Sequence, residues 1–340
     1  MTLMKRRAIL GAIAGSPLWL QMAARAQAAT TLKISHQFPG GSGNDGDFRD
    51  RLARAFAAEV EKRSKGSLKF AVYPGSSLMK TNSQFSAMRK GALDLSLVPL
   101  SYAGGEVPEV NIGLMPGLVT SYDQAYAWRN AEVGQELNRI LLEKGIVMVS
   151  WIWQAGGVAS RSKPIVEPED AKGMKIRGGS REMDLILKAA GAAVVSLPSN
   201  EIYAAMQTGA MDAALTSSTS LMSFRLEEVS KALTSGRGSA YWIMLEPLMM
   251  SKAVFDRLTK EQQGIILAVG AEMEAFARKS AQQDDAQVAA VYQKTGAKVA
   301  DLSVATVKKW QAIARTTAWK DYGERSESCA KLLKLAEKTL

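Results

Sequence analysis

Cysteine and histidine are almost missing from this sequence of 340 residues, which contains one of each, Cys329 and His36. A single cysteine cannot form a disulfide within the chain, so the fold must be held by packing. CxxC and HExxH patterns are absent, and a metal site is therefore not expected. A Ser-His-Asp hydrolase would have to use His36, and no GxSxG turn exists to present its serine. We expect no enzymatic activity and no cofactor.

Long apolar runs are also scarce, and the clearest one lies at the start of the chain. Three basic residues precede a charge-free run over residues 8–24, and a small-x-small cleavage pattern covers residues 26–28. The run is shorter than the roughly 20 residues that span a bilayer. It predicts a signal peptide and a mature periplasmic protein beginning near Ala29. Arg6-Arg7 approximates a twin-arginine signal, which leaves two export routes open.

Charge of one sign is not concentrated anywhere in the rest of the chain. Removal of residues 1–28 takes away four basic residues and no acidic one, so the net charge falls from +10 to +6. Lysine and arginine are scattered among aspartate and glutamate, with no run of five like charges. This pattern indicates a solvated surface and argues against a nucleic-acid partner. After cleavage no further segment is expected to be embedded in a membrane.

Strand and helix patterns alternate along the mature chain. Period-2 and helical spacing follow each other as βαβαβ from Leu32 to Val98 and resume at Met174. This order predicts an α/β fold in which mostly parallel sheets are covered by helices. The length predicts two domains rather than one. Strands are expected at residues 32–35, 68–73, 93–98, 146–151, 174–177, 193–196 and 211–215.

A long helix is expected near the carboxyl end. Thr259-x-x-Gln262 has the pattern of a capping box, and helical spacing continues almost unbroken to about Lys294. A helix of this length should either bridge two domains or be kinked. Gly264 and Gly270 are the expected weak points.

A glycine-rich loop supports an alternative function. Gly41-x-Gly43-x-x-Gly46 lies between the first strand and the first helix, where a dinucleotide-binding loop would lie. Five residues separate it from the strand, and the next strand does not end in an acidic residue. A flexible loop at the rim of a cleft is favoured. An exported NAD(P)-dependent oxidoreductase that uses this loop is the alternative.

Arg177 is the strongest candidate for ligand binding. It ends the strand 174–177 and is followed by Gly178-Gly179, so its side chain should project from the carboxyl edge of a parallel sheet. Ligands bind at that edge in open α/β sheets. A guanidinium matches a carboxylate through two parallel hydrogen bonds, which a lysine cannot reproduce. A surface ion pair is the competing interpretation.

Several segments resemble the solute receptors of tripartite ATP-independent periplasmic (TRAP) transporters, of the dicarboxylate-receptor type. The segment EDAKGMKIR at 169–177 is similar to the family's D-x-x-G-x-K-I-R, and EIYAAMQTGAMD at 201–212 is similar to E-x-Y-x-A-L-Q-x-G-x-x-D. GALD at 91–94 and LMPGL at 114–118 follow the family's order. The resemblance covers essentially the mature chain. A binding protein of another transporter class with similar architecture remains a second alternative.

The resemblance implies a two-lobed periplasmic binding protein with a long helix spanning both lobes. Lobe I would comprise residues 29–152 and about 243–282, and lobe II residues 153–242 and about 283–340. The arginine at Arg177 would grip a carboxylate of a small organic ligand. The lobes would close over this ligand, and the closed shape would be recognised by the TRAP membrane permease.

One departure from the family bears on the ligand. Many dicarboxylate and sialic-acid receptors have D-G-x-E-N where this chain has Asp212-Ala-Ala-Leu-Thr216, so Thr216 replaces the usual asparagine contact. Aromatic residues near predicted strand ends and crossovers suit an aromatic or bulky monocarboxylate. The ligand-binding candidates are Arg177, Thr216, Ser217, Gln154, Trp151, Trp153, Tyr241, Trp242, Phe38 and Tyr102.

Overall fold

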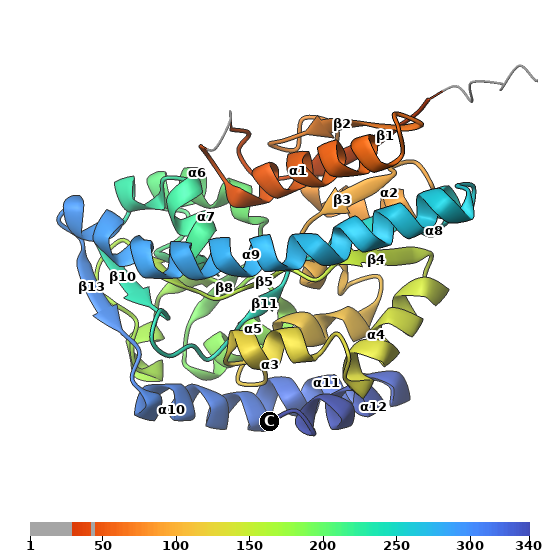
Figure 1. The fold of residues 1–340 in the computed structure, drawn as a ribbon. Coiled ribbons are helices and arrows are strands. Elements are labelled where there is room, and N and C mark those ends of the chain that lie inside the picture. The colour runs from red at the N-terminus through yellow and green to blue at the C-terminus, as the bar shows by residue number, and fades with distance from the viewer. Residues whose placement is uncertain (1–28, 42–44) are drawn as a thin grey trace, which may run out of the picture.

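Two β-sheets form the centres of two lobes in the computed structural model, which describes residues 29–41 and 45–340 (Figure 1). The predicted signal peptide and its cleavage site lie outside the described residues. The first sheet has the order β2-β1-β3-β12-β4 and the second the order β13-β10-β6-β9-β7-β8. The two-lobed α/β fold expected from the sequence is confirmed.

Lobe I is built on the first sheet. Its strands are β1 (Thr30–His36), β2 (Leu68–Tyr73), β3 (Leu95–Leu97), β4 (Ile146–Ser150) and β12 (Leu248–Ser251). Its helices are α1 (Phe48–Arg63), α2 (Gln84–Arg89), α3 (Tyr122–Ala127), α4 (Glu132–Glu143) and α8 (Lys252–Phe255).

The sequence of α1 explains where this helix starts and which face it buries. The Asp47 side chain accepts a hydrogen bond from the backbone N–H of Arg49 at 2.9 Å and so caps the helix. Phe48, Leu52 and Phe56 recur at intervals of four, and each is at most 1% exposed. Full burial of each such side chain contributes about 1.5–3 kcal/mol. This stripe packs α1 onto the lobe I sheet.

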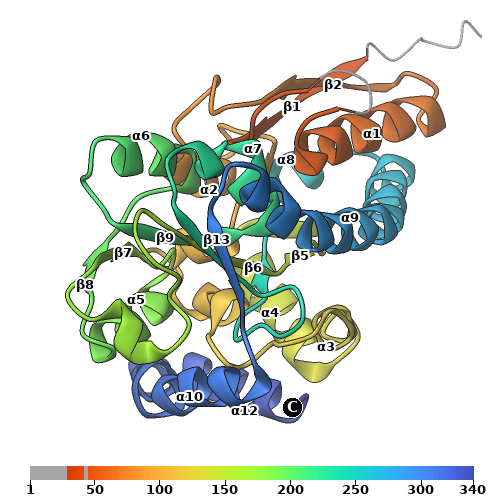
Figure 2. The ribbon, with the colours of Figure 1, turned by 90° about the vertical axis from the view of Figure 1, so that its left-hand side faces the viewer.

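Lobe II is built on the second sheet. Its strands are β6 (Gly156–Ser160), β7 (Lys175–Arg177), β8 (Ala193–Val195), β9 (Ala213–Ser217), β10 (Ala232–Ser235) and β13 (Lys298–Asp301). Its helices are α5 (Arg181–Ala189), α6 (Ile202–Gln207) and α7 (Ser218–Ser223), and Figure 2 shows them around the sheet.

One strand in each sheet runs against its neighbours, and both of these strands are entered directly from the other lobe. β6 is antiparallel to β9 and β10, and β12 is antiparallel to β3 and β4. The chain leaves lobe I at the carboxyl end of β4 and enters lobe II at the edge that faces lobe I. The incoming strand must therefore oppose the strands whose carboxyl ends lie there. The short strands β5 (Trp153–Gln154) and β11 (Met244–Leu245) pair with each other where the two crossovers meet.

Helix α9 (Lys260–Lys294) bridges the lobes without interruption (Figure 1). The capping box of Thr259 and Gln262 is confirmed. The helix contacts α1 and β4 in lobe I and α7, β10 and β13 in lobe II. A Cβ at Gly270 would lie 2.2 Å from the Val149 carbonyl oxygen. This glycine therefore permits close packing against β4, where the sequence suggested a weak point.

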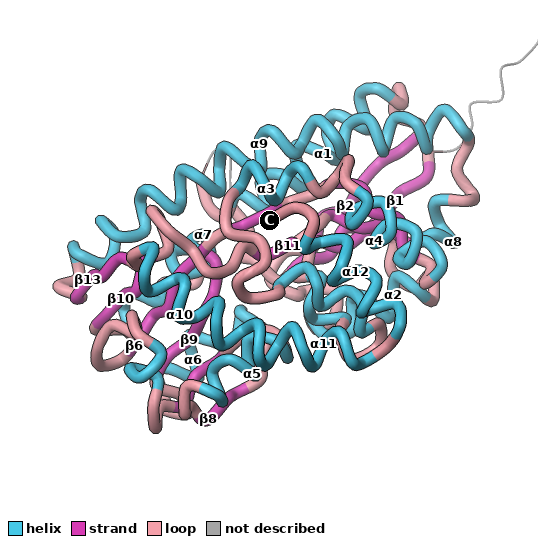
Figure 3. The backbone as a smooth tube through the Cα atoms, turned by 90° about the horizontal axis from the view of Figure 1, so that it is seen from below, coloured by secondary structure: helices cyan, strands magenta, loops and turns pink. Residues whose placement is uncertain are grey.

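The carboxyl-terminal helices form a second bridge. They are α10 (Val304–Ala314), the π-helix Arg315–Trp319, α11 (Lys320–Arg325) and α12 (Glu327–Glu337). The α10 and π-helical segments contact α5 of lobe II, whereas α12 contacts α4 of lobe I. In Figure 1 these helices lie along the lower side of the molecule, below α9, and in Figure 3, seen from that side, they run across the view. In the part of the chain that the structure describes, we find no helical segment with the length and hydrophobicity needed to span a bilayer.

Candidate ligand site between the lobes

A small cavity lies where the carboxyl edges of the two sheets meet. Its volume is about 10 Å³, the space of a single water molecule. Open α/β sheets present their ligand sites at this edge, and here two such edges share one site. Lobe I contributes Pro99, Tyr102 and Leu114, lobe II contributes Arg177, Gly178, Ser199, Leu215, Thr216 and Ser220, and the return crossover contributes Trp242, Met244 and Glu246.

Arg177 ends β7 and is held rigidly by neutral acceptors. Its Nε donates to the Leu197 carbonyl at 3.0 Å, and its Nη1 donates to the Leu215 carbonyl at 2.8 Å. Its Nη2 donates to the Tyr102 hydroxyl of lobe I at 2.8 Å. The residue is 4% exposed. Within the described residues no carboxylate lies within 4.0 Å of this guanidinium.

The bonding of Arg177 leaves capacity for a further partner. A guanidinium has five N–H donors, and the three bonds use one donor on each nitrogen. Among the described residues, one donor on Nη1 and one on Nη2 therefore remain without an acceptor. Two donors in a planar fork match the two oxygens of a carboxylate. Arg177 is thus a buried cation able to bind a planar anion.

Gly179 is required for this arrangement on two grounds. Its φ of +92° lies in the region that favours glycine. A Cβ at this position would also lie 2.6 Å from Nη1 of Arg177. The two glycines that follow β7 therefore leave the guanidinium free to turn toward the cavity.

A second buried arginine, Arg49, lies on the lobe I side. Its five donors make five bonds, to Asp47 twice, to Ser217, to Ser220 and to Glu246. The guanidinium lies 3.6 Å from the centre of the Phe38 ring, a cation–π contact. Ser217 and Ser220 belong to lobe II, so Arg49 joins the lobes. Arg49 was not among the residues expected from the sequence.

The two carboxylates of this cluster have opposite pKa shifts. Burial opposes ionisation of Asp47, but the paired Arg49 guanidinium outweighs burial and lowers the pKa of Asp47. Burial raises the pKa of Glu246 and outweighs the opposing effect of Arg49. Glu246 also lines the cavity. One sequence signal could have identified it, because Glu246 is a lone charge in the apolar run YWIMLEPLMM of residues 241–250.

The structure brings four of the sequence-predicted residues together. Arg177, Thr216, Trp242 and Tyr102 line the cavity. Trp242 also packs on Gly156, where an added Cβ would lie 2.6 Å from its ring. The roles of these residues in binding remain predictions.

The other six predicted residues are buried outside this lining. Ser217 caps α7, and Gln154 donates to Glu246. Trp153 packs edge-on against Trp128, with ring centres 5.4 Å apart, and Trp151 stacks beside Trp153. Tyr241 stacks on Trp310 at 5.1 Å, and Phe38 lies against Arg49. These aromatic side chains pack the crossovers between the lobes and the cluster around Arg49.

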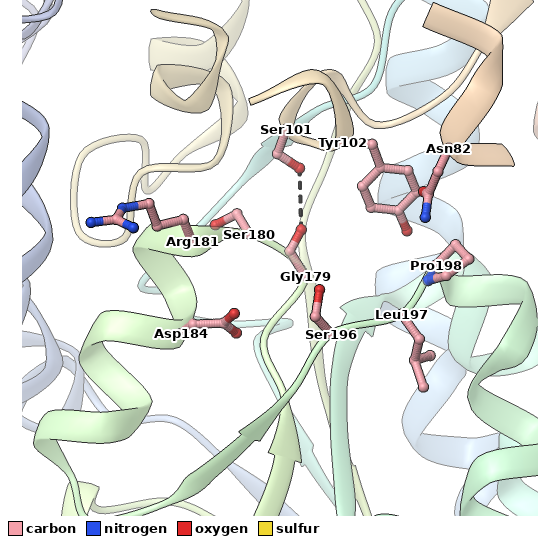
Figure 4. A pocket seen from close by; sticks show the side chains of 10 residues that line it. All are labelled: Asn82, Ser101, Tyr102, Gly179, Ser180, Arg181, Asp184, Ser196, Leu197 and Pro198. Atoms are coloured by element: carbon pink, nitrogen blue, oxygen red, sulfur yellow. Dashed lines mark hydrogen bonds between the residues drawn. The ribbon is translucent and has the colours of Figure 1, made fainter. Parts of the chain in front are cut away.

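An outer pocket of about 340 Å³, partly open to solvent, lies beside the cavity (Figure 4). Tyr102 lines both spaces. The lobes meet here as well, since the Ser101 hydroxyl donates to the Gly179 carbonyl at 3.3 Å. Burial raises the pKa of Asp184 in this pocket to about 6, against the opposing charges of Arg177 and Lys188.

The glycine-rich loop is only partly within the described residues, which omit 42–44. The Gly41 N–H donates to Asp50 at 3.0 Å, and Asp50 also bonds Nε2 of His36 at 3.1 Å. These bonds tie the start of the loop to α1. Among the described residues, no group of three or more His, Cys, Asp or Glu side chains could hold a metal ion.

This geometry is that of a two-lobed solute receptor, and comparison with known proteins agrees. Residues 43–325 match the family model for bacterial extracellular solute-binding protein, family 7. The chain belongs to this family, and it is a TRAP-transporter solute receptor. The resemblance found in the sequence is confirmed. Because the family consists of solute receptors, membership in it argues against the oxidoreductase alternative.

Individual relatives are similar over nearly the whole chain. A solute-binding protein of Albidiferax ferrireducens is 72% identical, over 99% of this chain and 100% of that protein. A crystal structure of a TRAP periplasmic solute-binding protein from Rhodoferax ferrireducens with bound malonate has 76% identity and a TM-score of 0.90. That match covers 91% of this chain and 98% of the other. A receptor from Sulfurospirillum deleyianum with bound succinate has 26% identity and a TM-score of 0.78, covering 92% and 100%.

Proposed function

We propose that this receptor binds a small organic carboxylate between its lobes in the periplasm and delivers it to a TRAP membrane permease. The observation that carries the proposal is Arg177, a buried guanidinium with two N–H donors left over and no carboxylate within ion-pair distance among the described residues. A buried charge is costly without a partner. A ligand carboxylate would supply both the charge and the two acceptors.

Ligand binding would favour the closed state because the site is formed from both lobes. Arg177 belongs to lobe II and Tyr102 to lobe I, and they are already bonded at 2.8 Å. A ligand that contacts both residues binds the closed arrangement better than an open one. The permease would then distinguish the closed receptor by its shape.

The size of the cavity favours a compact acid. The cavity volume of about 10 Å³ is far below the roughly 300–1,000 Å³ of pockets for drug-sized ligands, so the lobes must part to admit an acid, and a compact acid requires the smallest movement. Malonate and succinate, bound by the two similar receptors, are compact acids. The preference for an aromatic or bulky monocarboxylate remains a prediction, with Trp242 and Tyr102 as its candidate aromatic contacts. Thr216 is proposed as a polar contact.

Export through the amino-terminal segment is part of the proposal. The family is periplasmic, and residues 1–28 have the pattern of a signal peptide. Sequencing of periplasmic protein should find a terminus near Ala29. A periplasmic protein that retains Met1 would contradict cleavage.

Calorimetry and thermal unfolding with paired compounds test carboxylate binding. Malonate, succinate and aromatic acids are each compared with the corresponding neutral amide, which has a similar shape but no charge. An acid present at about 100 times its dissociation constant should stabilise the protein by roughly 2.7 kcal/mol. Equal responses to acids and amides, or no response to any acid, would reject the proposal.

A further inference from the structure

Glu246 lines the same cavity as Arg177 and is held in one orientation. It lies between β11 and β12, and its backbone N–H donates to the Ile152 carbonyl at 2.8 Å. Its side chain is 1% exposed. Oε2 accepts from Nη1 of Arg49 at 2.9 Å and from Nε2 of Gln154. Two donors on one oxygen fix the orientation of the carboxylate and oppose, without outweighing, the burial that raises its pKa.

The other oxygen of Glu246 is buried without a donor. Among the described residues, nothing donates a hydrogen bond to Oε1. Leaving a buried carboxylate oxygen unpaired is unfavourable, so a donor that enters the cavity gains a strong, charge-assisted bond.

The charges around the cavity also indicate that Glu246 favours a hydrogen-bond donor from a ligand. Arg49 is already paired with Asp47 through two bonds, which leaves Glu246 as the excess carboxylate of the cluster. Arg177 is the unpaired cation of the same cavity, and the two are not within 4.0 Å of each other. A complementary ligand therefore has an anionic group for Arg177 and a hydrogen-bond donor for Glu246.

We propose that Glu246 selects carboxylates that carry a hydroxyl or N–H donor, which bonds its Oε1. This inference rests on the proposed function, because it assumes that Arg177 binds the carboxylate. A diacid then fits only when its second carboxyl group shares a proton with Glu246, because two ionised carboxylates in contact repel each other. The charged groups that face Glu246 are Arg49 and Asp47, with Gln154 as a neutral donor.

The test compares acids that differ in one hydroxyl group. Lactate is titrated against propionate, and malate against succinate, into the wild type, Glu246→Gln and the control Glu143→Gln. Glu143 is an exposed ion-pair residue on α4. We expect the wild type and the control to prefer the hydroxy acid in at least one pair by roughly 10- to 150-fold. Glu246→Gln keeps an acceptor for Arg49 but presents an amide at Oε1, so the preference should disappear.

Malonate provides an independent measurement. Its affinity should fall as the pH is raised, because the shared proton is lost, whereas the affinity of lactate should not. Equal affinities within both pairs in the wild type, or the same preference in Glu246→Gln, would overturn the inference and leave the proposed function standing. If no acid binds to the wild type, the inference about Glu246 and the proposed function are both rejected.

Discussion

The two buried arginines show how the same side chain can serve structure or binding. Arg49 makes five hydrogen bonds with its five donors, three of them to carboxylates when both bonds to Asp47 are counted. Arg177 makes three bonds, all to neutral oxygens. The first guanidinium is neutralised by the protein, and the second has donors left over. The number of unused donors and the missing counter-charge, rather than burial itself, therefore distinguish a binding arginine from a structural one.

The position of each arginine in the fold explains this difference. Arg49 is in the first turn of α1, where the capping residue Asp47 lies within reach of its side chain. Arg177 ends a strand and is followed by glycines that offer no side chain to pair with it. The neighbouring sequence therefore places a carboxylate beside Arg49 but none beside Arg177.

The largest expected effect is the loss of stability in Arg49→Met. Removal of this guanidinium leaves the carboxylates of Asp47 and Glu246 buried without their partner, which costs about 3–5 kcal/mol. Urea unfolding without ligand measures the change. In Arg177→Met we expect much less loss, because no carboxylate is left unpaired. Equal losses of unfolding free energy in Arg49→Met and Arg177→Met would contradict the distinction between a structural and a binding arginine.

Arg177→Lys should weaken ligand binding and leave stability nearly unchanged. The positive charge is retained, but the planar fork is lost. Loss of one charge-assisted bond, about 1.5–3 kcal/mol, corresponds to roughly 10- to 150-fold weaker binding. Calorimetric titration with an acid bound by the wild type measures it. The control Arg139→Lys alters the exposed ion pair with Glu143 on α4 and should bind normally. An unchanged dissociation constant in Arg177→Lys would remove this residue from the site.

Gly179→Ala tests the position of the Arg177 guanidinium, because it should move this group while residue 177 remains arginine. The new Cβ would lie 2.6 Å from Nη1, so the guanidinium must move, and we expect about tenfold weaker binding. Gly173→Ala is the matched control, because Gly173 has φ +76° and no atom within 4 Å of an added Cβ. Both variants should lose roughly 1–2 kcal/mol of stability from backbone strain. Equal affinities in the two would show that the position of Nη1 is unimportant.

The smallest expected effect concerns Asp184, which lies near Arg177. Its pKa is raised from 3.8 to about 6 in the folded protein by burial. The native state therefore holds this proton more tightly, and the resulting stability is present below about pH 3.8 and lost as the pH rises through about 6. Because the carboxyl group is partly exposed, solvent screening reduces the effect to about 1 kcal/mol.

Urea unfolding across this pH range, with Asp184→Asn beside the wild type, tests the assignment. The variant should lack this part of the pH dependence and should be the more stable protein above about pH 6. It should also bind anions more tightly, because a negative charge near Arg177 is removed. Identical pH profiles would show that Asp184 does not titrate in this range.

Much of the fold could be predicted because its signals are local. Alternating spacing located β1 to β4 and β7 to β9, and the capping box at Thr259 located the start of α9. The strands β6, β10, β12 and β13 were not predicted, although β6 and β12 lie inside their sheets. The reversed direction of β6 and β12 has no local signal. It follows from how the chain crosses between lobes, which spacing along one element does not reveal.

The candidate site was only partly predictable for a related reason. Arg177 could be identified because a strand followed by glycines indicates a sheet edge. Arg49 and Glu246 are 197 positions apart and meet only in the folded protein. The aromatic residues could not be sorted between packing and cavity lining, because Trp151 and Trp153 have the same local pattern as a ligand-binding wall.

The sequence by itself determined the α/β class, the long helix, the family and the position of Arg177 at a strand end, since each depends on neighbouring residues or short motifs. Tertiary structure alone decided that Arg49 is saturated and Arg177 is not, and that Glu246 faces the cavity with an unpaired oxygen. The physical reason is that hydrogen bonding and charge pairing depend on distance in space, and the groups concerned come from two lobes between which the chain crosses repeatedly.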